Sequence, residues 1–237
     1  MPRPDGKIAI VAALHREVSG LIKDWQSVSR QYEGRDFRFF ESDRLVLVCG
    51  GIGVEAARRA TEAIIALYQP GLIVSTGFAG ALVAGLKVGD LLTPGCVIDA
   101  RDGSRHETGL GEGALLTIQE VAGAERKTKL AKAYGALAVD MEAAAVARGA
   151  ETHNVQFLAV KAISDQLDFA MPRVDRFVNS AGQFKTARFS AYVALRPWLW
   201  KSVIQLGRNS SVASRVLRNT LSQESILGMT ASKRGNS

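Results

Sequence analysis

The fold is decided by a strand-to-helix junction, Ala138-Val139-Asp140-Met141-Glu142-Ala143-Ala144-Ala145-Val146-Ala147. It places two carboxylates, Asp140 and Glu142, where an apolar strand runs into an alanine-rich helix. Burying an unpaired carboxylate at such a junction is costly, so both acids need partners. One interpretation makes Asp140 the N-cap and Glu142 a partner of the helix dipole. The other places both acids in a ligand site, and a second acid after a later strand, in Ser164-Asp165, favours this one.

The rest of the chain repeats the same pattern of an apolar strand, a polar turn and a helix. Strands are expected at 7–13, 45–49, 72–76, 137–139 and 155–163. This alternation predicts an α/β sheet with helices on both faces. Ligands of such sheets bind at the carboxyl ends of the strands. One active site is therefore expected from the segments that follow strands, namely Glu17, the turns at 50–53 and 77–80, 140–142 and 164–165.

Composition indicates a soluble globular protein. The 237 residues are 47% hydrophobic and 22% charged, which is ordinary for such proteins. No apolar run approaches the roughly 18 residues that a membrane span needs, and the first residues carry no signal-peptide pattern. Cys49 and Cys96 lie in apolar surroundings without metal-ligand spacing, which predicts reduced, buried thiols. We expect a cytoplasmic protein.

Charge is concentrated in the last part of the chain. Residues 176–237 hold ten Lys or Arg and one acid, Glu224, a net charge of +9. A basic helical segment with Trp198 and Trp200 suits the surface of an anionic membrane, although it also fits a solvated face. Nucleic acid is not expected, because no aromatic and basic residues interleave. We expect one domain over 1–221, its basic helical part at 176–221, and a disordered tail at 222–237.

Two motifs suggest anion binding. Residues 51–56 match G-x-G-x-x-A, but the next strand ends without the acid that a dinucleotide site requires. What survives is the weaker prediction that the backbone of Gly51 and Gly53 approaches an anion or a ribose. Arg105, beside His106 in a polar stretch, is a further candidate for phosphate, or only a solvated residue.

Several blocks in their order along the chain resemble the nucleoside phosphorylase/nucleosidase superfamily, in particular its methylthioadenosine/S-adenosylhomocysteine nucleosidase branch. The matching blocks are Ile8–Val18, Gly51–Gly53, Ser75–Gly80, Val88–Asp90, Ala138–Ala147 and Ala162–Asp165. The resemblance implies a three-layer α/β/α fold around a mixed, strongly bent sheet, often in homo-oligomers. It also implies a purine nucleoside ligand and neither metal nor organic cofactor, with phosphate as co-substrate in a phosphorylase.

The resemblance also implies roles for individual residues. Glu142 would accept hydrogen bonds from the ribose hydroxyls, and Met141 would pack against the sugar. Asp165 would hold the purine and donate a proton toward N7, while Glu17 would activate water. Further substrate contacts are expected from Phe78, Ala79, Gly80, Ser164 and, loosely, Val121. Such groups suit N-glycosidic cleavage, which builds positive charge on the ribose and negative charge on the base.

The departures are as informative as the matches. The nucleosidases carry a serine where this chain has Phe78, and the hexameric phosphorylases an arginine where it has Ser75. The chain is also short between Ala100 and Ala114. These features and the Arg196-Pro197 tail look more like the hopanoid-associated phosphorylases, thought to cleave adenine from adenosylhopane. Arg16 then becomes a phosphate candidate.

Phosphorolysis of an adenosine with a bulky apolar 5′ group is therefore the leading expectation. The alternatives are hydrolysis of methylthioadenosine or S-adenosylhomocysteine, and a binder of purine nucleosides without catalysis.

Overall fold

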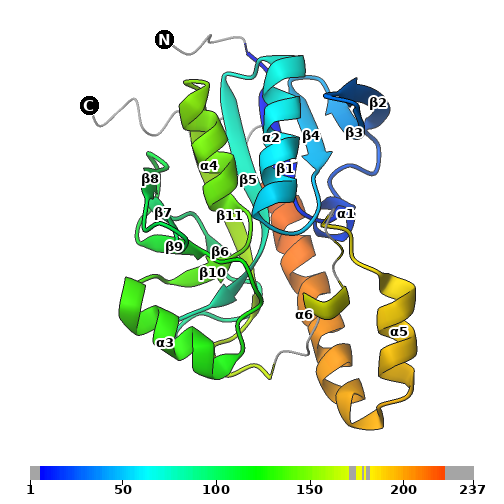
Figure 1. Ribbon diagram of the computed structural model, residues 1–237, viewed down its shortest axis with the longest axis vertical. Coiled ribbons are helices and arrows are strands. Elements are labelled where there is room, and N and C mark those ends of the chain that lie inside the picture. The colour runs from blue at the N-terminus through cyan, green and yellow to red at the C-terminus, as the bar shows by residue number, and fades with distance from the viewer. Residues whose placement is uncertain (1–5, 171–174, 178, 180–181, 222–237) are drawn as a thin grey trace.

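A computed structural model describes residues 6–170, 175–177, 179 and 182–221. Its strands form one mixed sheet with helices against both faces, as the sequence predicted (Figure 1). The strands are β1 (Ile8–Ala12), β2 (Gln26–Tyr32), β3 (Arg35–Ser42), β4 (Leu45–Cys49), β5 (Leu72–Ala81), β6 (Leu91–Leu92), β7 (Cys96–Asp99), β8 (Arg105–Glu107), β9 (Ala114–Thr117), β10 (Ala138–Asp140) and β11 (Gln156–Asp165). The helices are α1 (His15–Val18), α2 (Val54–Tyr68), α3 (Ala124–Tyr134), α4 (Ala143–Thr152), η1 (Asp175–Phe177), α5 (Thr186–Ala194) and α6 (Pro197–Thr220).

The sheet bends at β5, which pairs with three other strands. Its order is β2-β3-β4-β1-β5-β10-β9-β7-β8, with β11 also on β5 and β6 on β11. One edge of β5 is parallel to β1 over its first four residues and antiparallel to β10 at Gly80 and Ala81. The other edge is parallel to β11 along the whole strand. Two partners with different directions on one edge force the sheet to turn.

The expected turn at 77–80 is wrong, because β5 continues through these residues. Gly77 has a φ of 142°, which a residue with a side chain rarely adopts, and so lets the strand bend without ending. Register with β11 is kept from Gly77 to Ala79 opposite Lys161 to Ile163. The consequence for function is that Phe78, Ala79 and Gly80 stand on a fixed strand.

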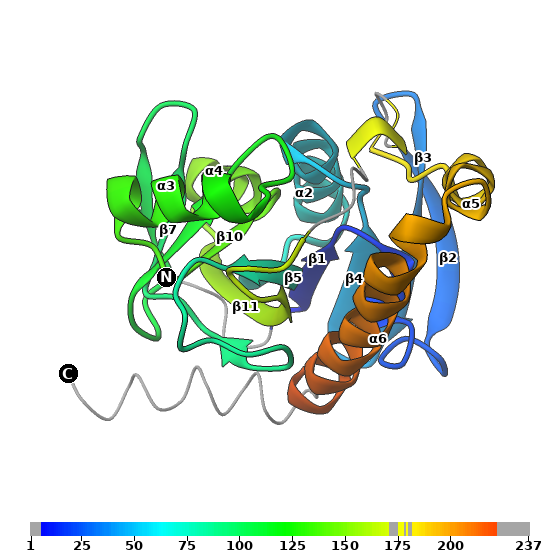
Figure 2. The same ribbon diagram turned by 90° about the horizontal axis from the view of Figure 1, so that it is seen from below.

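Apolar cores cover both faces of the central strands. Figure 2 shows α2 and α4 on one side of the central strands and α6 on the other. The alanines of α4 are buried, so this helix packs closely on the strands and on α2. On the opposite face, Ala213 and Leu217 of α6 pack against residues of β1, β4 and β11. The three-layer α/β/α arrangement predicted from the sequence is confirmed.

The first half of α6 leaves the sheet and forms a projecting hairpin with α5 (Figure 1). The hairpin exposes large apolar side chains: Leu195 is 77% and Trp198 73% exposed. None of the helices in the described ranges is both long and apolar enough to cross a membrane. The tail expected at 222–237 lies outside the described residues.

Candidate active site

The predicted site residues surround one cavity of about 810 Å³, called the main cavity below. It lies where β1, β10 and β11 end and where β5 bends. Eleven of the thirteen predicted residues line it: Arg16, Glu17, Gly53, Phe78, Ala79, Gly80, Val121, Met141, Glu142, Ser164 and Asp165. Gly51 lines a neighbouring cavity instead. Arg105 stands on β8 near the far end of the sheet and lines neither cavity.

Glu17 lies at the bottom of the main cavity on α1. The side chain is buried, and Oε2 accepts hydrogen bonds from the amides of Ala13 (3.1 Å) and Leu14 (3.0 Å). Burial raises the pKa of this carboxyl above its usual value, against the lowering effect of the Leu14 amide and of Lys161. A Cβ at position 77 would stand 3.0 Å from Oε2, so Gly77 makes room for this carboxylate.

The two acids of the 138–147 junction, Asp140 and Glu142, have different hydrogen-bond partners. Asp140 accepts hydrogen bonds from Thr117 Oγ1 (2.6 Å) and from the amide of Ala143, the first residue of α4 (2.9 Å). Both acids line the main cavity, and there Oε1 of Glu142 accepts a hydrogen bond of 2.8 Å from the amide of Gly53. Burial and the neighbouring Asp140 raise the pKa of Glu142 to about 8. The predicted N-cap at Asp140 is wrong by position, since Glu142 is the N-cap residue of α4, and the ligand role of Glu142 stays a prediction.

The glycine turn is engaged within the protein. The amide of Gly51 donates to the carbonyl of Ala13 (3.0 Å), and that of Gly53 donates to Glu142. Neither N–H group points to a free anion position in this structure. The turn therefore serves to hold the Glu142 carboxylate.

A buried lysine that the sequence analysis missed joins the acids. Lys161 on β11 forms an ion pair of 2.9 Å with Asp140 and donates to Ser75 Oγ at 3.1 Å. Burial alone would lower its pKa, but Asp140 and Glu142 raise the pKa above its usual value. A lysine inside the apolar run 157–163 was the available signal, since a charge in a buried strand needs partners.

The opposite end of the main cavity is built around Asp165, where β11 ends in an irregular register against β5. Oδ1 accepts a hydrogen bond from Ser164 Oγ at 2.7 Å. Oδ2 forms an ion pair with the buried Lys127 of α3, whose ammonium also donates to the carbonyl of Gln166 (2.7 Å). Apolar Ile118, Val121 and Ala122 line this end as well. A cavity end that is partly apolar and carries hydrogen-bonding groups suits a heterocyclic base.

Other chemistries find little support in the described ranges. They hold no group of three His, Cys, Asp or Glu that could bind a metal ion. Cys49 and Cys96 are free thiols; Cys96 is buried, as predicted, whereas Cys49 is half-buried. Burial raises the pKa of Cys49 to about 12, so this thiol is not a nucleophile at neutral pH.

Fold and site together define an α/β protein with a nucleoside-sized cavity that carries acids at both ends. A sequence model of the phosphorylase superfamily matches residues 7–124 and 102–194. The chain belongs to this superfamily.

Individual relatives are named as nucleosidases. A 5′-methylthioadenosine/S-adenosylhomocysteine nucleosidase from Buchnera aphidicola subsp. Acyrthosiphon pisum (strain APS) is 25% identical over 203 residues, 68% of this chain and 86% of that protein. The solved structure of such a nucleosidase from Colwellia psychrerythraea 34H, in complex with adenine, has a TM-score of 0.61 and 24% identity, covering 71% of this chain and 86% of that one. Arabidopsis thaliana 5′-methylthioadenosine nucleosidase has a TM-score of 0.71 and 18% identity, over 99% and 98%.

Proposed function

We propose that this protein hydrolyses the N-glycosidic bond of an adenine nucleoside. The observation that carries the proposal is the division of the main cavity, with Glu17 and Glu142 at one end and Asp165 at the other. A nucleoside has the matching polarity, a sugar with hydroxyl donors and a base with nitrogen acceptors. The nucleosidase names of the relatives support adenine as the base.

The acids match the charges that develop in the reaction. When the bond from C1′ to the base nitrogen breaks, its electron pair leaves with the base and C1′ becomes positive. Glu142 is placed to stabilise this charge through the ribose hydroxyls. Glu17 takes a proton from the attacking water, a role favoured by its raised pKa. Asp165, held by Ser164 and Lys127, binds the base, and the Lys127 ammonium supplies, through the Asp165 carboxylate, the proton that N7 gains.

We propose hydrolysis in place of phosphorolysis, the reaction that the sequence alone favoured. The relatives are nucleosidases, and a buried carboxylate at Glu17 repels an anionic nucleophile but can activate neutral water. The amides of Gly51 and Gly53 already donate hydrogen bonds within the protein, which also favours water over phosphate as the nucleophile. Retention of three carboxylates on one cavity argues against a binder without catalysis.

The 5′ position of the nucleoside is proposed to carry an apolar substituent. Phe184 and Phe189 close the main cavity from the α5 region, and Leu206 closes it from α6. These side chains offer a surface for a thioether or hydrocarbon group. A hopanoid substrate is one chemically suitable case, and its support remains the resemblance alone.

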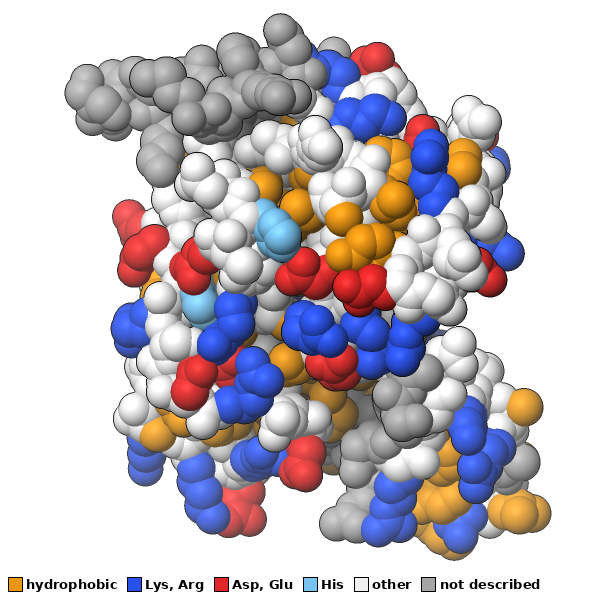
Figure 3. Space-filling view, turned by 45° about the horizontal axis from the view of Figure 1, so that its top comes forward, with side chains coloured by type: hydrophobic (Ala, Val, Ile, Leu, Met, Phe, Trp, Pro, Cys, Tyr) orange, Lys and Arg blue, Asp and Glu red, His pale blue; other side chains and the backbone are white. Residues whose placement is uncertain are grey.

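Further proposals concern the surroundings of the enzyme. We propose that the α5–α6 hairpin contacts an anionic membrane from one side, because its exposed tryptophans lie among Arg196, Lys201 and Arg208. Figure 3 shows apolar and basic side chains together on this lobe, at the lower right.

A location in the cytoplasm is proposed as well, because free cysteines suit its reducing conditions. Function without a cofactor and in a homo-oligomer is proposed from the family resemblance.

Adenine release from methylthioadenosine tests the main proposal. The wild-type protein is expected to release adenine in buffer without phosphate, and the Asp165→Asn variant to do so roughly 10²–10⁴ times more slowly. Arg58→Gln, on the outer surface of α2, is the matched control and keeps wild-type turnover. Failure of the wild-type protein to release adenine from any 5′-substituted adenosine contradicts the proposal.

A further inference from the structure

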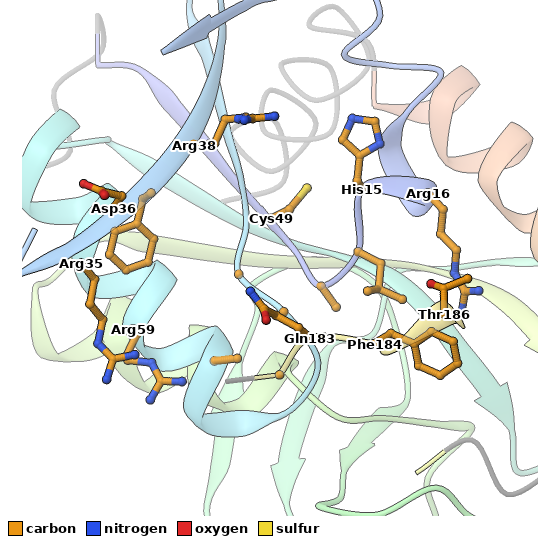
Figure 4. Close-up of a pocket in the computed structure, with 17 residues that line it drawn as sticks. His15, Arg16, Arg35, Asp36, Arg38, Cys49, Arg59, Gln183, Phe184 and Thr186 are labelled. Carbon is orange, nitrogen blue, oxygen red and sulfur yellow. The ribbon is translucent and has the colours of Figure 1, made fainter. Parts of the chain in front are cut away.

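A second cavity, of about 530 Å³, adjoins the main cavity and is rich in arginine. We call it the arginine cavity, after Arg16 of α1, Arg35 and Arg38 of β3, and Arg59 of α2, which line it (Figure 4). These elements are far apart in sequence, and the fold brings their cationic side chains to one basin. Asp36 is the one acid among the lining residues.

The arginines are only partly neutralised within the protein: Arg16 interacts with the carboxylate of Glu17, and Arg35 with that of Glu55. Arg16, Arg35 and Arg38 form no ion pair with any residue that the structure describes. Arg59 lies 3.1 Å from Glu55, which it shares with Arg58. Four guanidinium groups against Asp36, the shared Glu55 and the neighbouring Glu17 leave the cavity with a net positive charge. Several fork-shaped donors around one space suit a carboxylate or phosphate group.

The position of the arginine cavity relates it to the proposed substrate. It shares five lining residues with the main cavity: Ala13, Leu14, Arg16, Phe184 and Thr186. These lie beside Glu17 and the glycine turn, at the end assigned to the sugar, and none belongs to the end around Asp165. A substituent that leaves the sugar there passes the apolar side chains of Leu14 and Phe184 before it meets the arginines.

We propose that the arginine cavity binds an oxyanion, carboxylate or phosphate, at the far end of the 5′ substituent of the substrate. The inference rests on the proposed function and narrows its substrate class to adenosines with an apolar linker and an anionic terminus. Free phosphate has the same chemistry and could fill the same cavity, so the experiment separates the two sources.

The test uses two adenosines that differ only at the end of the linker. One carries a 5′-butylthio group, and the other a 5′-(3-carboxypropyl)thio group, in which a carboxylate replaces the methyl group. Dissociation constants are measured by calorimetry on proteins that all carry Glu17→Gln to slow turnover. Adenine release is measured separately on the wild-type protein, with and without phosphate. Arg35→Gln/Arg38→Gln is the test variant, and Arg58→Gln is the control.

The carboxylate compound is expected to bind about fivefold more tightly than the butyl compound, since exposed ion pairs contribute little singly but several arginines share the anion. Arg35→Gln/Arg38→Gln should remove most of this preference, whereas Arg58→Gln should keep it. Equal binding of the two compounds, or a preference that survives the double substitution, overturns the inference.

Adding phosphate shows whether the substrate or free phosphate supplies the anion that the arginine cavity binds. If it only weakens binding of the carboxylate compound, the substrate supplies the anion, as proposed. If it accelerates adenine release and the acceleration needs Arg35 and Arg38, free phosphate is the ligand and the assignment to the 5′ substituent is overturned. Absence of adenine release from both compounds contradicts the proposed function, while the binding ratio still decides the anion site.

Discussion

The Lys127 ammonium and the Asp165 carboxylate form a buried ion pair at the base end of the main cavity. Lys127 reaches it from α3, while Asp165 ends β11, and the ammonium also donates to the Asp165 carbonyl at 3.4 Å, so the pair joins these two elements. With Ser164 on the other oxygen, both oxygens of Asp165 accept hydrogen bonds before any base arrives. The pair therefore fixes the orientation of the carboxylate that is to meet the purine.

Removal of Lys127 should affect both stability and catalysis. Lys127→Met leaves a buried carboxylate without its partner, which typically destabilises a protein by about 3–5 kcal/mol. Urea unfolding measures this loss, and the double variant Lys127→Met/Asp165→Asn should recover part of it. If Lys127 orients Asp165, the single variant should also lower kcat more than it raises KM, at a temperature where it is folded. A change in stability alone would restrict Lys127 to a structural part.

Gly80 is expected to be indispensable because of this ion pair. A Cβ at position 80 would lie 2.8 Å from Asp165 Oδ2 and 3.0 Å from Lys127 Cε. Gly80→Ala should displace the carboxylate and reduce adenine release by about 10²-fold. Gly85→Ala is the control, because nothing lies within 4 Å of its added Cβ. Equal activities of the two variants would refute this role of Gly80.

When it is ionised, Glu142 should lower the stability of the ligand-free protein. Its pKa is 4.5 in the unfolded chain and about 8 in the fold, so the unfolded state loses its proton first as the pH rises. The stability that this group contributes is full below about pH 4.5 and is lost progressively toward pH 8. Glu142→Gln avoids this loss, so its melting temperature should exceed that of the wild type by at least about 2 °C at pH 8 and by less at pH 5.

Glu55→Gln is the control, for which no gain in stability is expected at high pH. The hydrogen bond from Arg58 lowers the pKa of Glu55, so this exposed acid gives no gain when it is neutralised. Scanning calorimetry at several pH values distinguishes the two variants. A Glu142→Gln protein that is no more stable than the wild type at pH 8 would contradict the raised pKa of Glu142.

Activity should depend on pH through the same carboxylates. Burial raises the pKa of Glu17, and burial with Asp140 raises that of Glu142 to about 8. Both must be ionised to accept hydrogen bonds from the ribose and a proton from water, so kcat/KM should rise with pH and level off above about 8. Steady-state kinetics from pH 5 to 9 on Glu142→Gln should give a much lower, flatter profile. A wild-type profile that is flat over this range would show that the ionisation of Glu142 in the free enzyme does not control kcat/KM.

Much of the site could be predicted because strand ends carry it. Glu17, Glu142 and Asp165 each follow an apolar run, and the carboxyl ends of such strands converge in an α/β sheet. The junction at 138–142 also raised the choice between a cap and a ligand site, which depends on side-chain direction. In the structure both acids line the main cavity, and Asp140 in addition accepts a hydrogen bond from the first amide of α4.

What could not be predicted depends on distant partners. Lys127 looks like any lysine of a charged helix, and only the packing of α3 brings it to Asp165. Gly77–Gly80 reads as a turn because glycine is permissive, but pairing with β11 over the whole length of β5 holds it as a strand. The arginine cavity draws on three elements, so no local pattern marks it.

The most direct test of the central claim is the fate of water oxygen. The protein is incubated with methylthioadenosine in ¹⁸O-labelled water that also contains phosphate, and the sugar product is analysed by mass spectrometry. Hydrolysis predicts a free 5-methylthioribose that carries one ¹⁸O atom at C1. A 5-methylthioribose 1-phosphate without the label would show that phosphate is the nucleophile and would contradict the account.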